Sequence, residues 1–270
     1  MEIDTGTNEL LCVVREGVAL ITLNRPEARN AMSEKLTPAL RTQIKERGDD
    51  PDVGAILITG AGTAFCSGGD VKSMGGRSAR TQLSFEDRLR DLRWRQMGLT
   101  GALVGLRKPT IAALPGAAAG AGLAIALACD IRIAARSAFV STGYARVGLS
   151  GDYGIAWLLT RAVGSVRARE LMFTAERVDA ERCERIGLVN RIVADDRLQE
   201  EAFAFAKSLA EGPRVALRNM KDNLDDALHV DYPTALYREA ERLVQASRTE
   251  DHKEAVRAFV EKRKPVFVGR

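Results

Sequence analysis

Short, almost wholly apolar runs alternate with longer amphipathic segments through the first two-thirds of the chain. Val18–Leu23, Gly54–Thr59, Thr110–Leu114 and Ile131–Ala134 each have the length and composition of a strand buried on both faces, as in a parallel sheet. Leu11–Val14 precedes the first of them across a Glu-Gly turn and is expected to pair with it. The alternation with helical segments predicts an α/β fold with right-handed crossovers.

Three helices are expected between these strands. Ser33 is a good cap for a helix that runs to about Arg47, and Glu34 in its first turn favours the helix dipole. The charged stretch Thr81–Leu106 has the pattern of an amphipathic helix, and Gly122–Ala128 reads as an apolar one. Helices of this length can make the crossovers that parallel strands need.

The strand pattern stops near residue 195, and only helical patterns follow. We therefore place a boundary there, between an α/β region, 1–195, and a helical C-terminal region, 196–270. The expected helices of the second region are Leu198–Ala210, Arg214–Leu228, Pro233–Ser247 and His252–Lys262.

Composition and charge narrow the class of protein. The chain has 270 residues, of which 46% are hydrophobic and 28% are charged with mixed sign, so it can form a packed core. A formal net charge of +4 suits a phosphate-bearing ligand without specifying one. The four cysteines lack metal-site spacing and are read as buried thiols in a reducing compartment. The polar first eight residues do not resemble a signal peptide, so a cytoplasmic location is expected.

Neither a membrane nor a nucleic acid is expected as a partner. Ile111–Cys129 carries no charge and approaches spanning length, but its glycines, its proline and its many alanines give a weak transfer energy. A buried strand–turn–helix is the favoured interpretation of this stretch. The chain also lacks the interleaved aromatic and basic residues with which single-stranded RNA is bound.

Two glycine-bearing segments follow buried strands, namely Ala64–Lys72 (AFCSGGDVK) and Pro115–Gly122 (PGAAAGAG). Small residues let a ligand oxygen approach backbone N–H groups, and two converging N–H groups make an oxyanion hole. At a helix N-terminus the dipole adds to this effect. Neither segment has a phosphate-loop pattern, and either one alone is compatible with a simple close-packed turn.

Six motifs follow one another along the chain, namely Ile21–Ser33, Ala64–Lys72, Lys108–Ala134, Arg146–Gly164, Glu184–Val193 and Ala258–Pro265. Together and in this order they resemble the crotonase (enoyl-CoA hydratase/isomerase) superfamily over nearly the whole chain. The resemblance implies an α/β spiral of ββα units with a helical C-terminal region that trimerises. It also implies a coenzyme A thioester as substrate, no further cofactor and no metal, and a homo-oligomer that is a trimer or a hexamer.

The resemblance also implies roles for individual residues. By position in the motifs, the N–H groups of Gly69 and Ala121 would polarise the thioester carbonyl and stabilise an enolate. Phe259 and Lys262 match residues that reach the coenzyme A of a neighbouring subunit, although Lys262 equally fits a solvated basic surface. Tyr144 falls where it would line the acyl pocket or serve as an ordinary core aromatic. The implied coenzyme A groove contains Ala28, Arg29, Ser67, Gly68, Asp70, Val71 and Lys72.

The chain departs from this family at its two acid–base positions. The family's hydratases carry glutamates where this sequence has Ala124 and Tyr144, so the two-glutamate mechanism is not transferred. Asp152 falls where some crotonase-like isomerases place their key aspartate, and a lone carboxylate suits proton shuttling during double-bond isomerisation. The alternatives are that Asp152 is a turn residue and that the chain is a degenerate acyl-CoA-binding protein without turnover.

Overall fold

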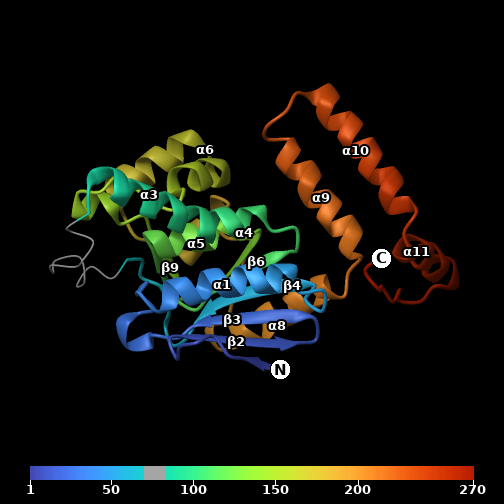
Figure 1. The fold of residues 1–270 in the computed structure, drawn as a ribbon, viewed down its shortest axis with the longest axis horizontal. Coiled ribbons are helices and arrows are strands. Elements are labelled where there is room, and N and C mark those ends of the chain that lie inside the picture. The colour runs from blue at the N-terminus through green and yellow to red at the C-terminus, as the bar shows by residue number, and fades with distance from the viewer. Residues whose placement is uncertain (70–82) are drawn as a thin grey trace.

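The computed structural model describes residues 1–69 and 83–270 (Figure 1). Within these residues the strands form a seven-stranded sheet and a four-stranded sheet. The larger sheet has the order β1 (Glu2–Ile3), β2 (Leu10–Arg15), β3 (Val18–Leu23), β4 (Ala55–Gly60), β6 (Thr110–Leu114), β8 (Ile131–Ala135) and β11 (Arg191–Val193). The smaller has the order β10 (Val178–Asp179), β9 (Phe139–Ser141), β7 (Ala117–Ala119) and β5 (Ala64–Cys66).

Successive segments give one strand to each sheet and then a helix. β6 and β7 are followed by α5 (Ala121–Ala128), and β8 and β9 are followed by α6 (Ile155–Thr174). Between β3 and β4, β4 and β6, β6 and β8, and β8 and β11, the pairing is parallel. This arrangement confirms the α/β class and the predicted spiral of ββα units.

The four apolar runs are strands, as predicted. Every residue of β4 and β6 is buried, because helices and the smaller sheet cover the centre of the large sheet on both faces. β2 and β3 form the expected antiparallel pair, and their turn places Glu16 and Gly17 at positive φ. Ile111–Cys129 contains β6, β7 and α5, which confirms the buried strand–turn–helix. No helix in 1–69 or 83–270 is both long and apolar enough to cross a membrane.

Two of the helices differ from the sequence-based prediction, one in its first residue and the other in its regularity. Ser33 lies just before α1 (Leu36–Asp49), whose N-cap residue is Lys35, and the Ser33 hydroxyl accepts from the N–H groups of Lys35 and Leu36 at 3.1 and 2.9 Å. The charged stretch after residue 82 is not one regular helix. It divides into α3 (Phe85–Gln96), a wider π-helical turn (Met97–Gly101) and α4 (Ala102–Gly105). Residues 81 and 82 of the predicted helix lie outside the described residues.

The C-terminal helices fall into two groups. The last strand ends at Val193, next to the predicted boundary, and α8 (Leu198–Ala210) then packs on the large sheet through residues that include Ala202 and Ala206. Figure 1 shows that α9 (Arg214–Asp226), α10 (Tyr232–Ser247) and α11 (Glu250–Glu261) project away from the sheets. α7 (Ala180–Arg185) joins β10 to β11.

Ion pairs fasten α9 to the body of the protein. The Arg107 guanidinium contacts the carboxylates of Asp222 and Asp225 at 2.7 and 2.8 Å, and Lys221 contacts Asp130 at 2.8 Å. Within α9 one residue is buried, the polar Asn219. Charge pairing, more than apolar burial, therefore positions α9.

Gly122 decides how closely α5 approaches β5, and Gly122→Ala is expected to destabilise the protein. Alanine gains about 1 kcal/mol over glycine in a helix. A Cβ on Gly122, however, would lie 2.2 Å from the carbonyl oxygen of Cys66, and such overpacking costs about 1–3 kcal/mol or more. A lowered urea midpoint is expected. The matched control is Gly105→Ala in α4, where nothing lies within 4 Å of the new Cβ and stability should stay or rise. A Gly122→Ala variant as stable as the parent would contradict the close approach.

Candidate active site

The two glycine-bearing segments lie against each other. Each contains a strand of the small sheet, β5 and β7, which pair in parallel, so the loops that follow them meet at one edge. Gly68 has φ +92°, and a Cβ there would lie 2.8 Å from the carbonyl oxygen of Ala119 and 3.4 Å from the nitrogen of Ala121. Glycine is therefore needed at position 68 both for its backbone conformation and for this contact.

Ala121 is the first residue of α5, so its N–H belongs to the turn that has no acceptor within the helix. Gly120 precedes it as the N-cap with φ 52° and ψ −125°, a conformation that favours glycine. On the other segment, Gly69 forms a parallel bridge with Met32, whose N–H donates to the Gly68 carbonyl at 2.8 Å. The Gly68–Gly69 turn therefore lies beside the N-terminus of α5, which is the positive end of the helix dipole.

Residues expected in the coenzyme A groove are partly assembled here. Ser67 donates from its N–H to the Arg29 carbonyl at 3.0 Å and from its hydroxyl to the Ala28 carbonyl at 3.4 Å. Ala28 ends the 3-10 turn η1 (Pro26–Ala28), and Arg29 has φ 51°. The structure therefore brings Ala28 and Arg29 to Ser67 and Gly68. The expected residues Asp70, Val71 and Lys72 lie outside the described residues.

Asn30 fixes the segments that carry these expected residues, a role the sequence did not reveal. Its fully buried side chain donates to the carbonyls of Ala61 and Ala64 at 2.9 and 2.8 Å, and its Oδ1 accepts from the N–H of Arg25. Asn30 therefore ties η1 to the start of β5. The signal available in the sequence was the asparagine that ends the Arg-Pro-Glu-Ala-Arg-Asn run, because asparagine tolerates a left-handed backbone conformation. In the structure Asn30 has φ 56°.

Tyr144 and Asp152 form a hydrogen-bonded pair beside the start of α5, in which Tyr144 is buried and Asp152 is half-buried. Tyr144 opens the 3-10 turn η4 (Tyr144–Val147) and is only 6% exposed. Its hydroxyl donates to Oδ1 of Asp152 at 2.5 Å, and a Cβ on Gly120 would lie 4.0 Å from that hydroxyl. Ala124, at the other acid–base position of the family, is fully buried in α5 and has no titratable group.

The environment moves both pKa values upward. Burial raises the pKa of Asp152, while the hydrogen bond from Tyr144 opposes that rise by stabilising the carboxylate. Burial, reinforced by the charge and the hydrogen bond of Asp152, raises the pKa of Tyr144. Tyr144 is therefore a neutral donor near neutral pH, and Asp152 is the acceptor. A carboxyl pKa moved toward neutrality suits a group that takes up and returns a proton.

Cys66, the last residue of β5, has the properties of a structural thiol. It is fully buried, and burial raises its pKa to about 11, so the thiolate is scarce at neutral pH. Cys12, Cys129 and Cys183 are also buried, as expected from the sequence.

Phe259 and Lys262 are far from this region in the same chain. Phe259 is 86% exposed on α11, and Lys262 follows as the left-handed C-cap of that helix. In Figure 1, α11 lies at the opposite end of the molecule from α3 and β9. The protomer alone therefore does not bring these two residues to Ser67 and Gly68.

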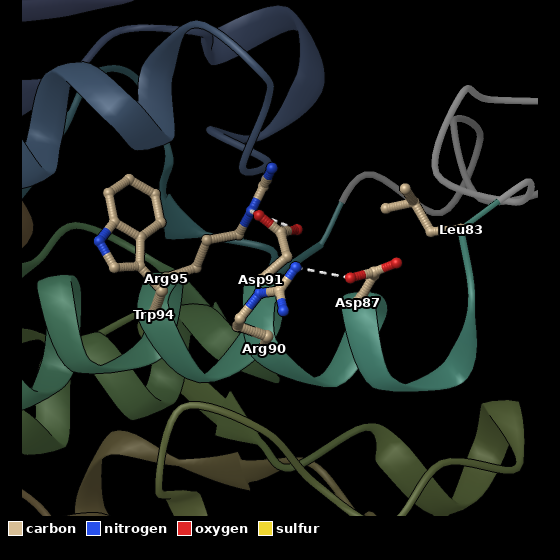
Figure 2. Close-up of a pocket in the computed structure, with 6 residues that line it drawn as sticks. All are labelled: Leu83, Asp87, Arg90, Asp91, Trp94 and Arg95. Atoms are coloured by element: carbon tan, nitrogen blue, oxygen red, sulfur yellow. Dashed lines mark hydrogen bonds and ion pairs between the residues drawn. The ribbon is translucent and has the colours of Figure 1, made fainter.

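An open surface hollow runs along α3 and is lined by Leu83, Asp87, Arg90, Asp91, Trp94 and Arg95 (Figure 2). Its charges are paired along the helix, with Asp87 and Arg90 2.6 Å apart and Asp91 and Arg95 2.8 Å apart. The guanidinium of Arg41 lies 4.4 Å from the centre of the Trp94 ring. These pairings favour a structural role over acid–base chemistry.

The chain belongs to the enoyl-CoA hydratase/isomerase family, whose profile matches residues 14–270. A probable enoyl-CoA hydratase of Mycobacterium bovis, echA8, is 37% identical over 266 residues, which cover 98% of this chain and all of that protein. The 1,2-epoxyphenylacetyl-CoA isomerase of Escherichia coli is 34% identical over 261 residues, covering 97% of this chain and 98% of the relative.

Solved structures show the same fold. A crystal structure of an enoyl-CoA hydratase/isomerase from Mycobacterium abscessus superposes with a TM-score of 0.91 at 32% identity, covering 97% of this chain and all of that one. An enoyl-CoA hydratase from Streptomyces coelicolor gives a TM-score of 0.91 at 36% identity, covering 97% and 94% of the two chains. The resemblance to the crotonase superfamily inferred from the motifs is therefore confirmed.

Proposed function

We propose that the protein is an acyl-CoA isomerase in which Asp152 transfers the proton and the N–H groups of Gly69 and Ala121 hold the thioester oxygen. The observation that carries this proposal is the hydrogen bond between buried Tyr144 and half-buried Asp152 beside the start of α5. This pair contains a carboxylate near the N-terminus of α5, whereas Ala124, at one of the family's acid–base positions, has none. The likeness to an isomerase acting on a cyclic acyl-CoA supports this choice.

Proton transfer accounts for the reaction without loss or gain of atoms. Asp152 takes a proton from a carbon next to the thioester or its conjugated double bond, and the electron pair moves onto the thioester oxygen. The two N–H groups stabilise that enolate through directed hydrogen bonds. The protonated carboxyl then returns the proton to a different carbon, so the double bond has moved and Asp152 is regenerated.

Hydration would need a second group to share the addition of water. The family's glutamate positions hold Ala124 and Tyr144, and the raised pKa of Tyr144 keeps its hydroxyl protonated. These substitutions also favour a second candidate, a protein that binds acyl-CoA without turning it over. Isomerisation is preferred because Asp152 retains a titratable carboxylate, which accepts the hydrogen bond from Tyr144.

A small thioester panel tests the proposal. Crotonyl-CoA, a 3-enoyl-CoA and a cyclic acyl-CoA derived from an aromatic ring are incubated with the protein and followed by ultraviolet absorbance and mass spectrometry. A moved double bond at unchanged mass is expected. A gain of one water would establish hydration instead, and binding without change across the panel would favour the non-catalytic candidate.

We further propose that the projecting helices join three protomers. Large apolar side chains are exposed along them in the single chain, which is a feature of surfaces that meet a partner. Phe259 and Lys262 would then reach the coenzyme A of a neighbouring subunit. The exposed apolar residues are Met220, Leu224, Leu236, Leu243, Val244, Val256, Phe259 and Val260.

Light scattering coupled to gel filtration is expected to give three or six times the protomer mass of 29.3 kDa. Paired Leu243→Glu and Val244→Glu substitutions place charge in the exposed apolar face of α10 and should lower the mass toward one protomer. Leu11→Glu, at another exposed apolar position, is the control and should leave the assembly intact. A parent protein of 29.3 kDa in solution would contradict the proposal.

A further inference from the structure

The Tyr144 side chain lies between Gly120, at the start of α5, and Asp152. Gly143 and Gly148, at φ 73° and 68°, flank η4 and turn the chain sharply on both sides of it. The N–H of Gly120 donates to Ser141 at 3.1 Å, so the segment leading into η4 runs across the start of α5. The phenol ring is thereby buried between Gly120 and Asp152. Solvent exposure does not explain the position of this hydroxyl.

We propose that Tyr144 is a positioning residue for the reaction, because its hydroxyl holds Oδ1 of Asp152 and directs Oδ2 toward the acyl group. This inference rests on the proposed isomerase function of Asp152. A carboxylate on a turn would otherwise rotate between several orientations, whereas a short charge-assisted hydrogen bond selects one of them. A fixed base meets its proton in a reactive geometry more often.

The same hydrogen bond tunes the base. Burial alone makes the Asp152 carboxylate harder to ionise, and the Tyr144 hydroxyl offsets part of that effect. Tyr153 is the other titratable neighbour that acts on Tyr144. On the same turn, Arg146 is exposed, and α5 has no titratable side chain. On α6 the first charged residue, Arg161, is held 3.5 Å from the Trp157 ring centre.

Tyr144→Phe tests this role, because it removes the hydroxyl and keeps the ring. The reaction needs ionised Asp152, so kcat/KM falls as the pH drops through the pKa of that group. Without the hydrogen bond that lowers this pKa, the acidic limb should move to higher pH by about one unit. We also expect kcat to fall roughly tenfold, with KM for the thioester nearly unchanged.

Tyr153→Phe is the matched control, since it removes a neighbouring buried phenol hydroxyl and leaves the Tyr144–Asp152 bond in place. Its pH profile should match the parent. A Tyr144→Phe variant with the parental acidic limb and a kcat within about twofold would overturn the inference.

Carbon-13 NMR titration of the Asp152 carboxyl separates this inference from the proposed function, because it needs no turnover. A higher Asp152 pKa in Tyr144→Phe than in the parent supports the tuning role even if no thioester reacts. An unchanged Asp152 pKa overturns that role even in an active isomerase. Failure of the proposed function alone would appear as full isomerase activity in Asp152→Asn.

Discussion

Asp152→Asn is expected to lower kcat for double-bond migration by about 10²–10⁴-fold, the range that a positioned general base contributes. Asparagine has nearly the same shape, and its Oδ1 still accepts a hydrogen bond from Tyr144. The fold and thioester binding should therefore survive. The amide cannot take a proton from carbon at neutral pH, so the loss should appear in kcat and hardly at all in KM.

Activity is measured by ultraviolet absorbance with the best thioester of the panel, and binding by isothermal titration calorimetry with the product. Asp196→Asn removes an exposed carboxylate from the 3-10 turn η5 (Asp195–Arg197) and serves as the control, with parental rates expected. Parental activity in Asp152→Asn would exclude Asp152 as the base. A loss of binding that matches the loss of rate would indicate a structural role instead.

Ala121→Pro is expected to lower kcat by about 10²–10³-fold, the usual cost of removing one oxyanion donor. Proline lacks the N–H that is proposed to bind the thioester oxygen. It is well tolerated at the first position of a helix, which is the place of Ala121 in α5, because that N–H has no partner within the helix. The glycine at position 68 also leaves space beside the nitrogen.

Ala121→Gly keeps the N–H and is the matched control, with at most a small loss of activity and stability expected. Circular dichroism and the melting temperature check that both variants fold. If the proline ring disturbs α5, replacement of Ala121 by lactic acid removes the N–H without a ring and repeats the test. A folded variant that lacks this N–H and retains parental kcat would contradict the proposed donor.

Long apolar runs were the most predictable part of the fold. The burial of all residues in β4 and β6 follows from continuous runs of apolar side chains, and no other placement hides so much apolar surface. The short strands β5 and β7 were not predicted. Each has only three residues, Ala-Phe-Cys in β5 and three alanines in β7, and segments this short carry no detectable period.

The site was predictable at its glycines and less so at its side chains. Gly68 and Gly120 stand out in the sequence because their small size leaves backbone exposed, and the structure brings their segments together. The Tyr144–Asp152 hydrogen bond was not predicted, because the intervening chain turns at Gly148 and Gly151 through positive φ. Glycine permits that conformation but does not require it. The roles expected for Gly69, Ala121 and Asp152 stay predictions.

The strand order of the large sheet also constrains how quickly the chain can fold. Ile21 pairs with Ile58, Ile58 with Ala112, and Ile133 with Arg191, so the strands of these parallel pairs are distant in sequence. Every such pairing must first overcome the entropy of closing a long loop, which makes folding slow for a protein of high contact order. During synthesis, the sheet stays incomplete until β11 has left the ribosome. Until then the edge of β8 that pairs with β11 keeps its backbone N–H and C=O groups unpaired, and this is the interval in which aggregation or chaperone binding competes with folding.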